Sequence, residues 1–110
     1  ELQRSLLKNG EAQTVLTSKQ RAYLRSLGNG APVILQVGKG SLGDALLKQA
    51  EEAIEARELI KVRVLKACPH PPDQIANQMA ESLGAELVQL VGRSFLLYRR
   101  SREPRIELPT

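Results

Sequence analysis

Hydrophobic positions change their period several times along the chain, and each change predicts a new element. Residues 18–27 and 42–54 repeat apolar side chains every three or four positions, as amphipathic helices do. Between them, residues 32–37 are nearly continuous in apolar side chains and rich in β-branched ones, which predicts a buried strand. Residues 58–66 then alternate between apolar and charged side chains, so this strand has one packed face.

The second half of the chain predicts a helix followed by a hairpin. Prolines interrupt the pattern near residue 70, and a third helix follows from there to Leu83, with Gly84 as its stop. Residues 86–91 and 94–99 predict two strands joined by a short turn at Gly92-Arg93. We therefore predict a single α/β domain in the order α-β-α-β-α-β-β, with three helices and a four-stranded mixed sheet.

Helix boundaries carry recognisable capping residues. Thr17 and Gln20 have the spacing of a capping box for the first helix, which we expect to stop at residues 28–30. For the second helix the sequence predicts Ser41 as the N-cap, with Asp44 at the third position complementing the helix dipole.

Length and composition narrow the class of protein. The chain has 110 residues, 42% hydrophobic and 25% charged, which suits one globular domain, and no apolar run approaches the roughly 20 residues that cross a bilayer. We expect residues 1–15 to be an extension of uncertain order and residues 16–110 to form the domain. The lone Cys68 excludes an internal disulfide, and we expect a monomer in the cytoplasm.

A glycine-rich loop joins the first predicted strand to the second helix. It contains Gly38, Lys39, Gly40 and Ser41, so flexible backbone, a lysine and a helix start come together, as in many phosphate sites. The alternative is a tight turn that needs glycine and binds nothing. The spacing of a nucleotide-binding Walker loop is absent, and the second strand lacks the acidic residue of a dinucleotide site.

Basic side chains exceed acidic ones and give a net charge of +4, which favours an anionic partner. Candidate phosphate contacts outside the loop are Lys19, Arg21, Arg25, Lys61, Arg63 and Arg93. Further arginines occupy residues 99–105, and for Arg100, Arg102 and Arg105 a disordered tail is the alternative. Aromatic residues make up only 3% of the chain, so if the anionic partner is a nucleic acid we expect contacts with its backbone and shape rather than base stacking.

The chain has no convincing catalytic set. His70 is the only histidine and lies among prolines, with no residue to orient it against Cys68. Glutamates 51, 52, 55 and 58 follow helical spacing and predict a solvated face. We predict a protein that is not an enzyme, with no catalytic residues, no metal site and no cofactor.

Several blocks of sequence, spread over about residues 16–109, belong together. They are Leu16-Thr17-Ser18-Lys19-Gln20-Arg21, Val37-Gly38-Lys39-Gly40, Glu58-Leu59-Ile60-Lys61-Val62, Val91-Gly92-Arg93, Leu97-Tyr98-Arg99 and Ile106-Glu107-Leu108-Pro109. In these blocks and in their order the chain resembles the CRM family, in particular its small bacterial YhbY-type members.

This resemblance implies a fold similar to the C-terminal domain of translation initiation factor three. It also implies binding of structured RNA, with ribosomal RNA of the large (50S) subunit or its precursor particle as the partner. Two alternatives stay open: a module that docks on ribosomal or assembly proteins, and one CRM module of a larger splicing factor. The family's loop has a KH-like Gly-x-x-Gly pattern at positions 38 and 41, and here position 41 is serine.

Overall fold

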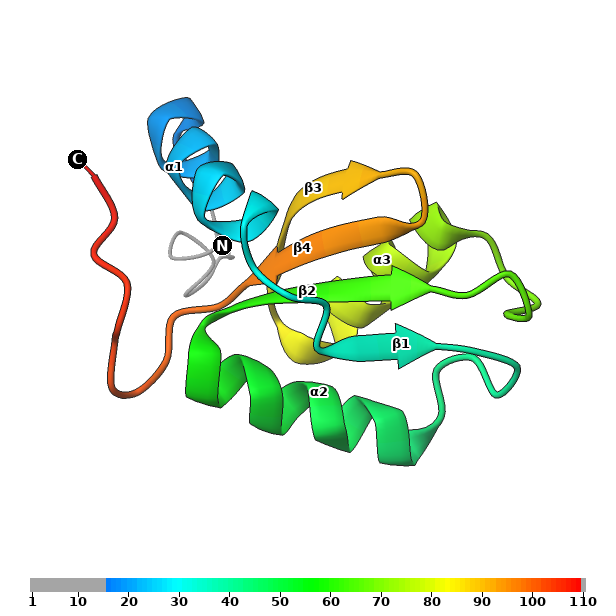
Figure 1. Cartoon of the computed structure of the whole chain (residues 1–110). Helices are drawn as coiled ribbons and strands as arrows, with labels where there is room; N and C mark the ends of the chain where they lie inside the picture. Colours follow the sequence, from blue (N-terminus) through cyan, green and yellow to red (C-terminus); the bar gives the residue numbers. More distant parts are fainter. Residues whose placement is uncertain (1–15, 110) are drawn as a thin grey trace, which may run out of the picture.

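The computed structural model describes residues 16–109 and contains the predicted elements in the predicted order (Figure 1). The helices are α1 (Ser18–Asn29), α2 (Asp44–Arg57) and α3 (Pro72–Leu83), and the strands are β1 (Leu35–Val37), β2 (Leu59–Val64), β3 (Glu86–Val91) and β4 (Ser94–Tyr98). The extension expected at residues 1–15 lies outside the described residues. β1 is shorter than predicted because Pro32 and Val33 lie outside the ladder.

The four strands form one mixed sheet in the order β1-β2-β4-β3. β1 pairs with β2 in parallel, and β4 pairs antiparallel with both β2 and β3. Helices α2 and α3 cover one face and α1 lies on the other, which gives three layers (Figure 1). The predicted α/β class and element order are confirmed. None of the helices in residues 16–109 has the length and apolar character needed to cross a membrane.

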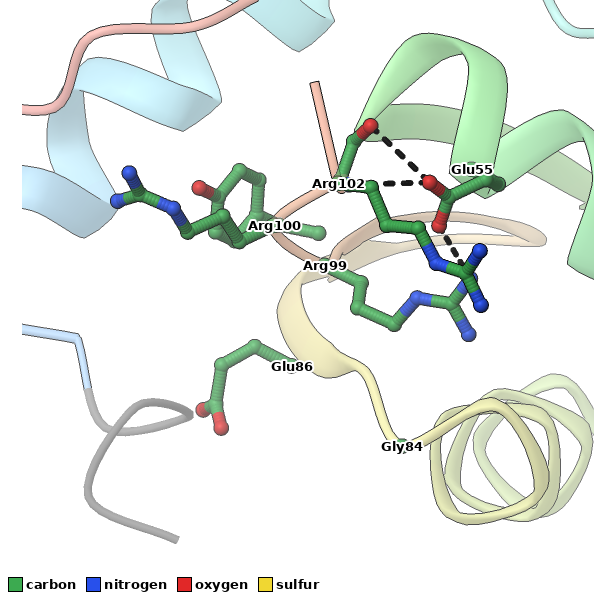
Figure 2. A pocket seen from close by; sticks show the side chains of 8 residues that line it. Glu55, Gly84, Glu86, Arg99, Arg100 and Arg102 are labelled. Carbon is green, nitrogen blue, oxygen red and sulfur yellow. Dashed lines mark hydrogen bonds and ion pairs between the residues drawn. The ribbon is translucent and has the colours of Figure 1, made fainter. Parts of the chain in front are cut away.

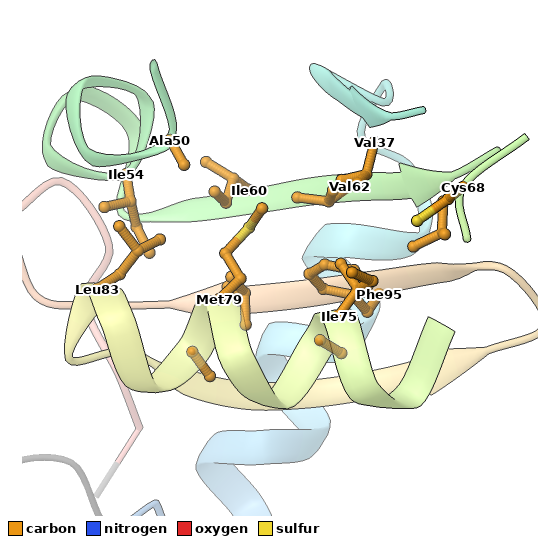
Figure 3. Close-up of a cluster of buried hydrophobic side chains, with 14 residues drawn as sticks. Val37, Ala50, Ile54, Ile60, Val62, Cys68, Ile75, Met79, Leu83 and Phe95 are labelled. Carbon is orange, nitrogen blue, oxygen red and sulfur yellow. The ribbon is translucent and has the colours of Figure 1, made fainter. Parts of the chain in front are cut away.

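The main core lies between the sheet and the helices α2 and α3 (Figure 3). Ile60, Val62 and Val64 of β2 all point into it, as the alternation along this strand predicts. Phe95 of β4 and Met79 of α3 fill the centre, and both are almost completely buried. Each such side chain contributes about 1.5–3 kcal/mol by leaving water, so this face supplies most of the stability.

The opposite face is only partly covered, because α1 has 12 residues and packs on one end of the sheet. Leu24 of α1 joins Val88, Leu96 and Tyr98 in a second, smaller core. Gly28 lets the helix approach closely, because a Cβ atom there would overlap the side chain of Leu96. Among residues 16–109, no helix covers the rest of this face, toward the carboxyl end of β2.

Residue 41 departs from the prediction at the start of α2. The N-cap of α2 is Gly43, which forms no side-chain cap hydrogen bond, so the predicted Ser41 cap is wrong. Ser41 has a positive φ of 53°, whereas an N-cap residue is normally extended. Asp44 is consequently the first residue of α2 rather than the third, although it still lies in the first turn. The predicted Thr17–Gln20 capping box is present, and Gly84 ends α3 with a φ of 64°.

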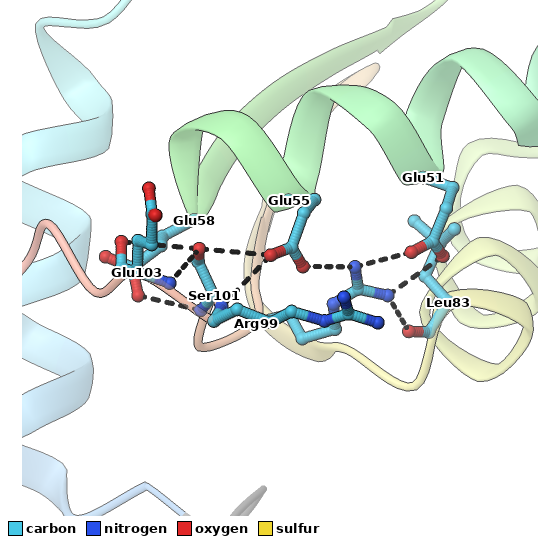
Figure 4. A network of polar contacts seen from close by, with 8 residues as sticks. Glu51, Glu55, Glu58, Leu83, Arg99, Ser101 and Glu103 are labelled. Atoms are coloured by element: carbon cyan, nitrogen blue, oxygen red, sulfur yellow. Dashed lines mark hydrogen bonds and ion pairs between the residues drawn. The ribbon is translucent and has the colours of Figure 1, made fainter.

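Glu55 and Glu58 hold the C-terminal tail, so the predicted solvated face is wrong for these two glutamates and holds for Glu51 and Glu52, which are exposed (Figure 4). Glu58 has no exposed surface and accepts hydrogen bonds from the backbone N–H groups of Ser101, Arg105 and Ile106. Glu55 accepts from the backbone N–H of Arg102 at 3.0 Å. Residues 100–109 are therefore packed against the domain, and the alternative of a disordered tail is wrong for them.

We predict that Glu58→Gln lowers the free energy of unfolding by about 2 kcal/mol. The amide of glutamine would turn a donor toward one of the three backbone N–H groups and remove the charge that strengthens all three bonds. Denaturant unfolding followed by circular dichroism measures the loss. Glu52→Gln, the same change at an exposed position of α2, is the control and should be neutral; equal stability of the two variants would contradict the role of Glu58.

Candidate nucleic-acid interface

Three connections meet at one edge of the sheet. Parallel pairing brings the ends of β1 and β2 together, so residues 38–43 lie beside residues 65–71 (Figure 1). The backbone N–H of Leu65 donates to the carbonyl of Val37 at 2.8 Å. The β3–β4 turn reaches the same edge, because the N–H of Val64 donates to the carbonyl of Arg93 at 2.7 Å.

The glycine loop forms a turn with free donor groups. Its chain reverses through a hydrogen bond from the N–H of Ser41 to the carbonyl of Gly38 at 2.9 Å. The N–H groups of Lys39 and Gly40 donate to no backbone group in residues 16–109. The Lys39 side chain is exposed and makes no ion pair with a described residue. The loop thus offers two amides and one ammonium to an anion.

A contact between loops holds Ser41 in its unusual conformation. The Ser41 hydroxyl lies 3.0 Å from Nδ1 of His70 and shares a hydrogen bond with it. Because a left-handed residue with a Cβ atom is normally unfavourable, this bond helps to offset the cost that glycine would avoid. Sequence reasoning missed His70 and the neighbouring exposed Lys66, although the rule that parallel strands end at one edge could have placed them near the loop.

Arg93 joins the hairpin turn to the end of β2. Its Nε donates to the carbonyl of Val64 and its Nη2 to the carbonyl of Leu65, both at 2.8 Å. These bonds fix the guanidinium, with its positive charge, at the end of β2. Arg93 therefore has a structural role, and its predicted phosphate contact remains a prediction.

Lys61 and Arg63 lie on the sheet face that α1 leaves uncovered. Their neighbours on β2 point into the main core, so both basic side chains point to the other side, as predicted. Arg63 is in register with Gln36 on β1 and with Ser94 on β4. Ser94 in turn pairs with Val91 on β3, which is 61% exposed. Gln36 and Ser94 are polar groups of this surface that the sequence pattern did not single out.

The basic residues of α1 are not brought to the glycine loop. Arg21 donates to the carbonyls of Leu87 and Val88 and pairs with Glu86 at 3.2 Å, so it fastens α1 to β3. Lys19 lies in the first turn of α1, beside Gln20, whose side chain donates to the carbonyl of Pro109 in the tail. Lys19, Arg21 and Arg25 are thus a separate basic group on α1, and their RNA contacts remain predictions.

A hollow of about 330 Å³ opens at the other end of the sheet, around the start of the tail (Figure 2). One of its arginines, Arg99, pairs with Glu55, and Glu86 adds a second carboxylate to the lining. Hydrogen bonds with Arg99 lower the pKa of Glu51, and the pKa of Arg99 is raised by the same contacts. Since Arg99 pairs with Glu51 at 2.6 Å, its charge is already balanced, and this hollow is a poor place for phosphate.

A family model decides the identity of the fold. The model of the CRS1/YhbY (CRM) domain matches residues 16–99. The chain belongs to this family. The resemblance inferred from the sequence is confirmed, and the matched range of this CRM protein includes the glycine loop, β2 and the hairpin.

Individual relatives agree with this assignment along their whole length. The chain is 44% identical over 96 residues to the "Probable RNA-binding protein YqeI" of Bacillus subtilis, covering 86% of this chain and 100% of the relative. It is 33% identical over 96 residues to an "RNA-binding protein" of Haemophilus influenzae, covering 87% and 97%. The solution structure of Staphylococcus aureus protein SAV1595 superposes with a TM-score of 0.73 at 42% identity, covering 86% of this chain and 100% of that one.

We predict that Ser41→Ala is less stable than Ser41→Gly by about 1 kcal/mol. Both variants lose the bond to His70, but only alanine keeps a side chain in the left-handed region that glycine enters freely. Denaturant unfolding of the two variants gives the difference. If alanine proved equal to or better than glycine, the left-handed conformation of residue 41 would be refuted.

Proposed function

We propose that this CRM protein binds structured RNA through the glycine loop and the uncovered sheet face. The observation that carries the proposal is the meeting of free loop amides, the exposed Lys39 and the strand bearing Lys61 and Arg63 at one edge of the domain. Relatives of similar length are named RNA-binding proteins, which supports the same class of partner.

The contacts suit recognition of an RNA backbone. Lys39 and the amides of Lys39 and Gly40 would hold one phosphate, in the manner of a backbone anion site. Lys61 and Arg63 are two residues apart on one strand face, about 7 Å along the strand, so they would neutralise further phosphates of the same molecule. Asp44 already complements the dipole of α2, so the loop rather than the helix end would carry the anion.

We further propose that the RNA is ribosomal RNA of the large subunit or its precursor, the partner that the family resemblance implies. The protein would then act as a monomeric assembly factor of the 50S particle in the cytoplasm, with no cofactor and no catalysis of its own. Residues 16–109 bring no three His, Cys, Asp or Glu side chains together as a metal site would need.

The charge reversals Lys39→Glu and Lys61→Glu, made together, should weaken binding to large-subunit precursor RNA at least tenfold at low salt. The slope of log affinity against log salt should fall by about one for each lysine removed. Filter binding across a salt series measures both quantities. The control is Arg57→Glu with Arg100→Glu, which changes the net charge by the same amount at exposed positions on the opposite end of the sheet. It should change the affinity and the salt slope much less.

Two results would overturn the proposal. The first is a folded wild-type protein that shows no salt-sensitive binding to this RNA. The second is a double variant that loses naked RNA yet still associates with precursor particles, which would favour a module that docks on ribosomal or assembly proteins.

A further inference from the structure

A groove of about 280 Å³ lies on the uncovered sheet face, beside the end of α1. It begins where the helix stops, because the close approach of Gly28 to Leu96 brings the helix end down onto the sheet. The groove is lined by both apolar and polar residues. Its lining includes Asn29, Lys61, Gln89, Val91, Ser94 and Leu96.

A β-bulge places Gln89 in this groove. The register of β3 against β4 shifts between Leu87, which pairs with Leu97, and Gln89, which pairs with Leu96. Leu97 belongs to the main core and Leu96 to the opposite face. Without the extra residue, strict alternation would turn Gln89 toward the main core, so the bulge redirects a polar side chain to the open face.

Gln89 carries an unused hydrogen-bond acceptor. Its Oε1 atom is buried and accepts no hydrogen bond in the part of the chain that the structure describes. Buried polar atoms of this kind are rare because an unpaired acceptor is costly. Lys61, Asn29 and Ser94, whose side chains carry donors, line the same groove, so a ligand there would meet donor-bearing residues as well as this acceptor.

We propose that the groove binds one unpaired nucleobase of the RNA, an inference that rests on the proposed function. A base is flat and apolar on its faces, which suits Val91 and Leu96, and it has N–H donors and acceptors on its edge, which suit Gln89 and Lys61. The volume lies just below the roughly 300–1,000 Å³ of sites for drug-sized molecules, so a single base is the appropriate size.

The position of the groove links this base to the phosphate contacts. Lys61 borders the groove, and Arg63 follows on the same strand face in the direction of the glycine loop. An RNA strand whose base enters the groove can therefore continue along Arg63 to Lys39. Backbone contacts would supply affinity, and the groove would favour RNA with an unpaired nucleotide over a fully paired stem.

The test compares an RNA stem carrying a single-adenine bulge with the same stem fully paired. We expect the wild-type protein to bind the bulged RNA about fivefold more tightly, the worth of roughly one hydrogen bond. Gln89→Met should abolish this preference, while its affinity for the paired stem stays within about twofold of wild type. The variant should also be at least as stable to unfolding as the wild type. Asn29→Ala, at the exposed end of α1, should reduce the preference as well. Gln78→Met, the same change on the exposed side of α3, is the control.

A second readout is the side-chain amide resonance of Gln89 in NMR spectra. It should shift when the bulged RNA is added and stay in place with the paired stem. Equal affinity for both RNAs, an unchanged preference in Gln89→Met, or a stationary Gln89 resonance would overturn the base site while the phosphate contacts of Lys39 still hold. If the folded protein bound neither RNA, the proposed function would fail and this inference with it.

Discussion

Parallel pairing of β1 with β2 is the constraint on which the rest of the structure depends. Two parallel strands require a crossover, which α2 provides, and their carboxyl ends then lie at the same edge. The glycine loop and residues 65–71 leave the sheet at that edge. β4 runs antiparallel to β2, so the hairpin turn with Arg93 returns to it as well. These two pairings thus gather three connections, and with them Lys39 and Arg93, at one edge.

The two faces of the sheet are buried to different extents, and this difference leaves part of one face open to a ligand. Helices α2 and α3 close one face, whereas α1 and the tail close only part of the other. The buried Glu58 carboxylate holds the tail, and Ile106 and Leu108 of that tail pack against the α1 core. The open remainder carries Lys61 and Arg63, so we infer that covering one end of this face stabilises the domain while the other end stays free for a ligand.

Local sequence patterns predicted the elements well and the long-range contacts poorly. The alternation along β2 predicted correctly which of its side chains are buried, and Thr17 and Gly84 marked the helix ends. These signals are readable because they depend on residues that are close together in the sequence. Glu58 has helical spacing with other glutamates, yet its partners lie 43 to 48 residues away and no period reveals them. Ser41 failed as a cap for the same reason: its hydroxyl has a partner 29 residues distant. The bulge that redirects Gln89 likewise could not be predicted from the apolar and polar positions of residues 86–91.

Mapping the protein residues that crosslink to bound RNA tests the central claim most directly. Ultraviolet crosslinking of the folded protein to large-subunit precursor RNA, followed by mass spectrometry of the linked peptides, locates the contact surface. The account predicts crosslinks in residues 38–41, along 61–66 and near the hairpin turn, the segments that meet at one edge. Crosslinks confined to the outer faces of α2 and α3 would contradict it.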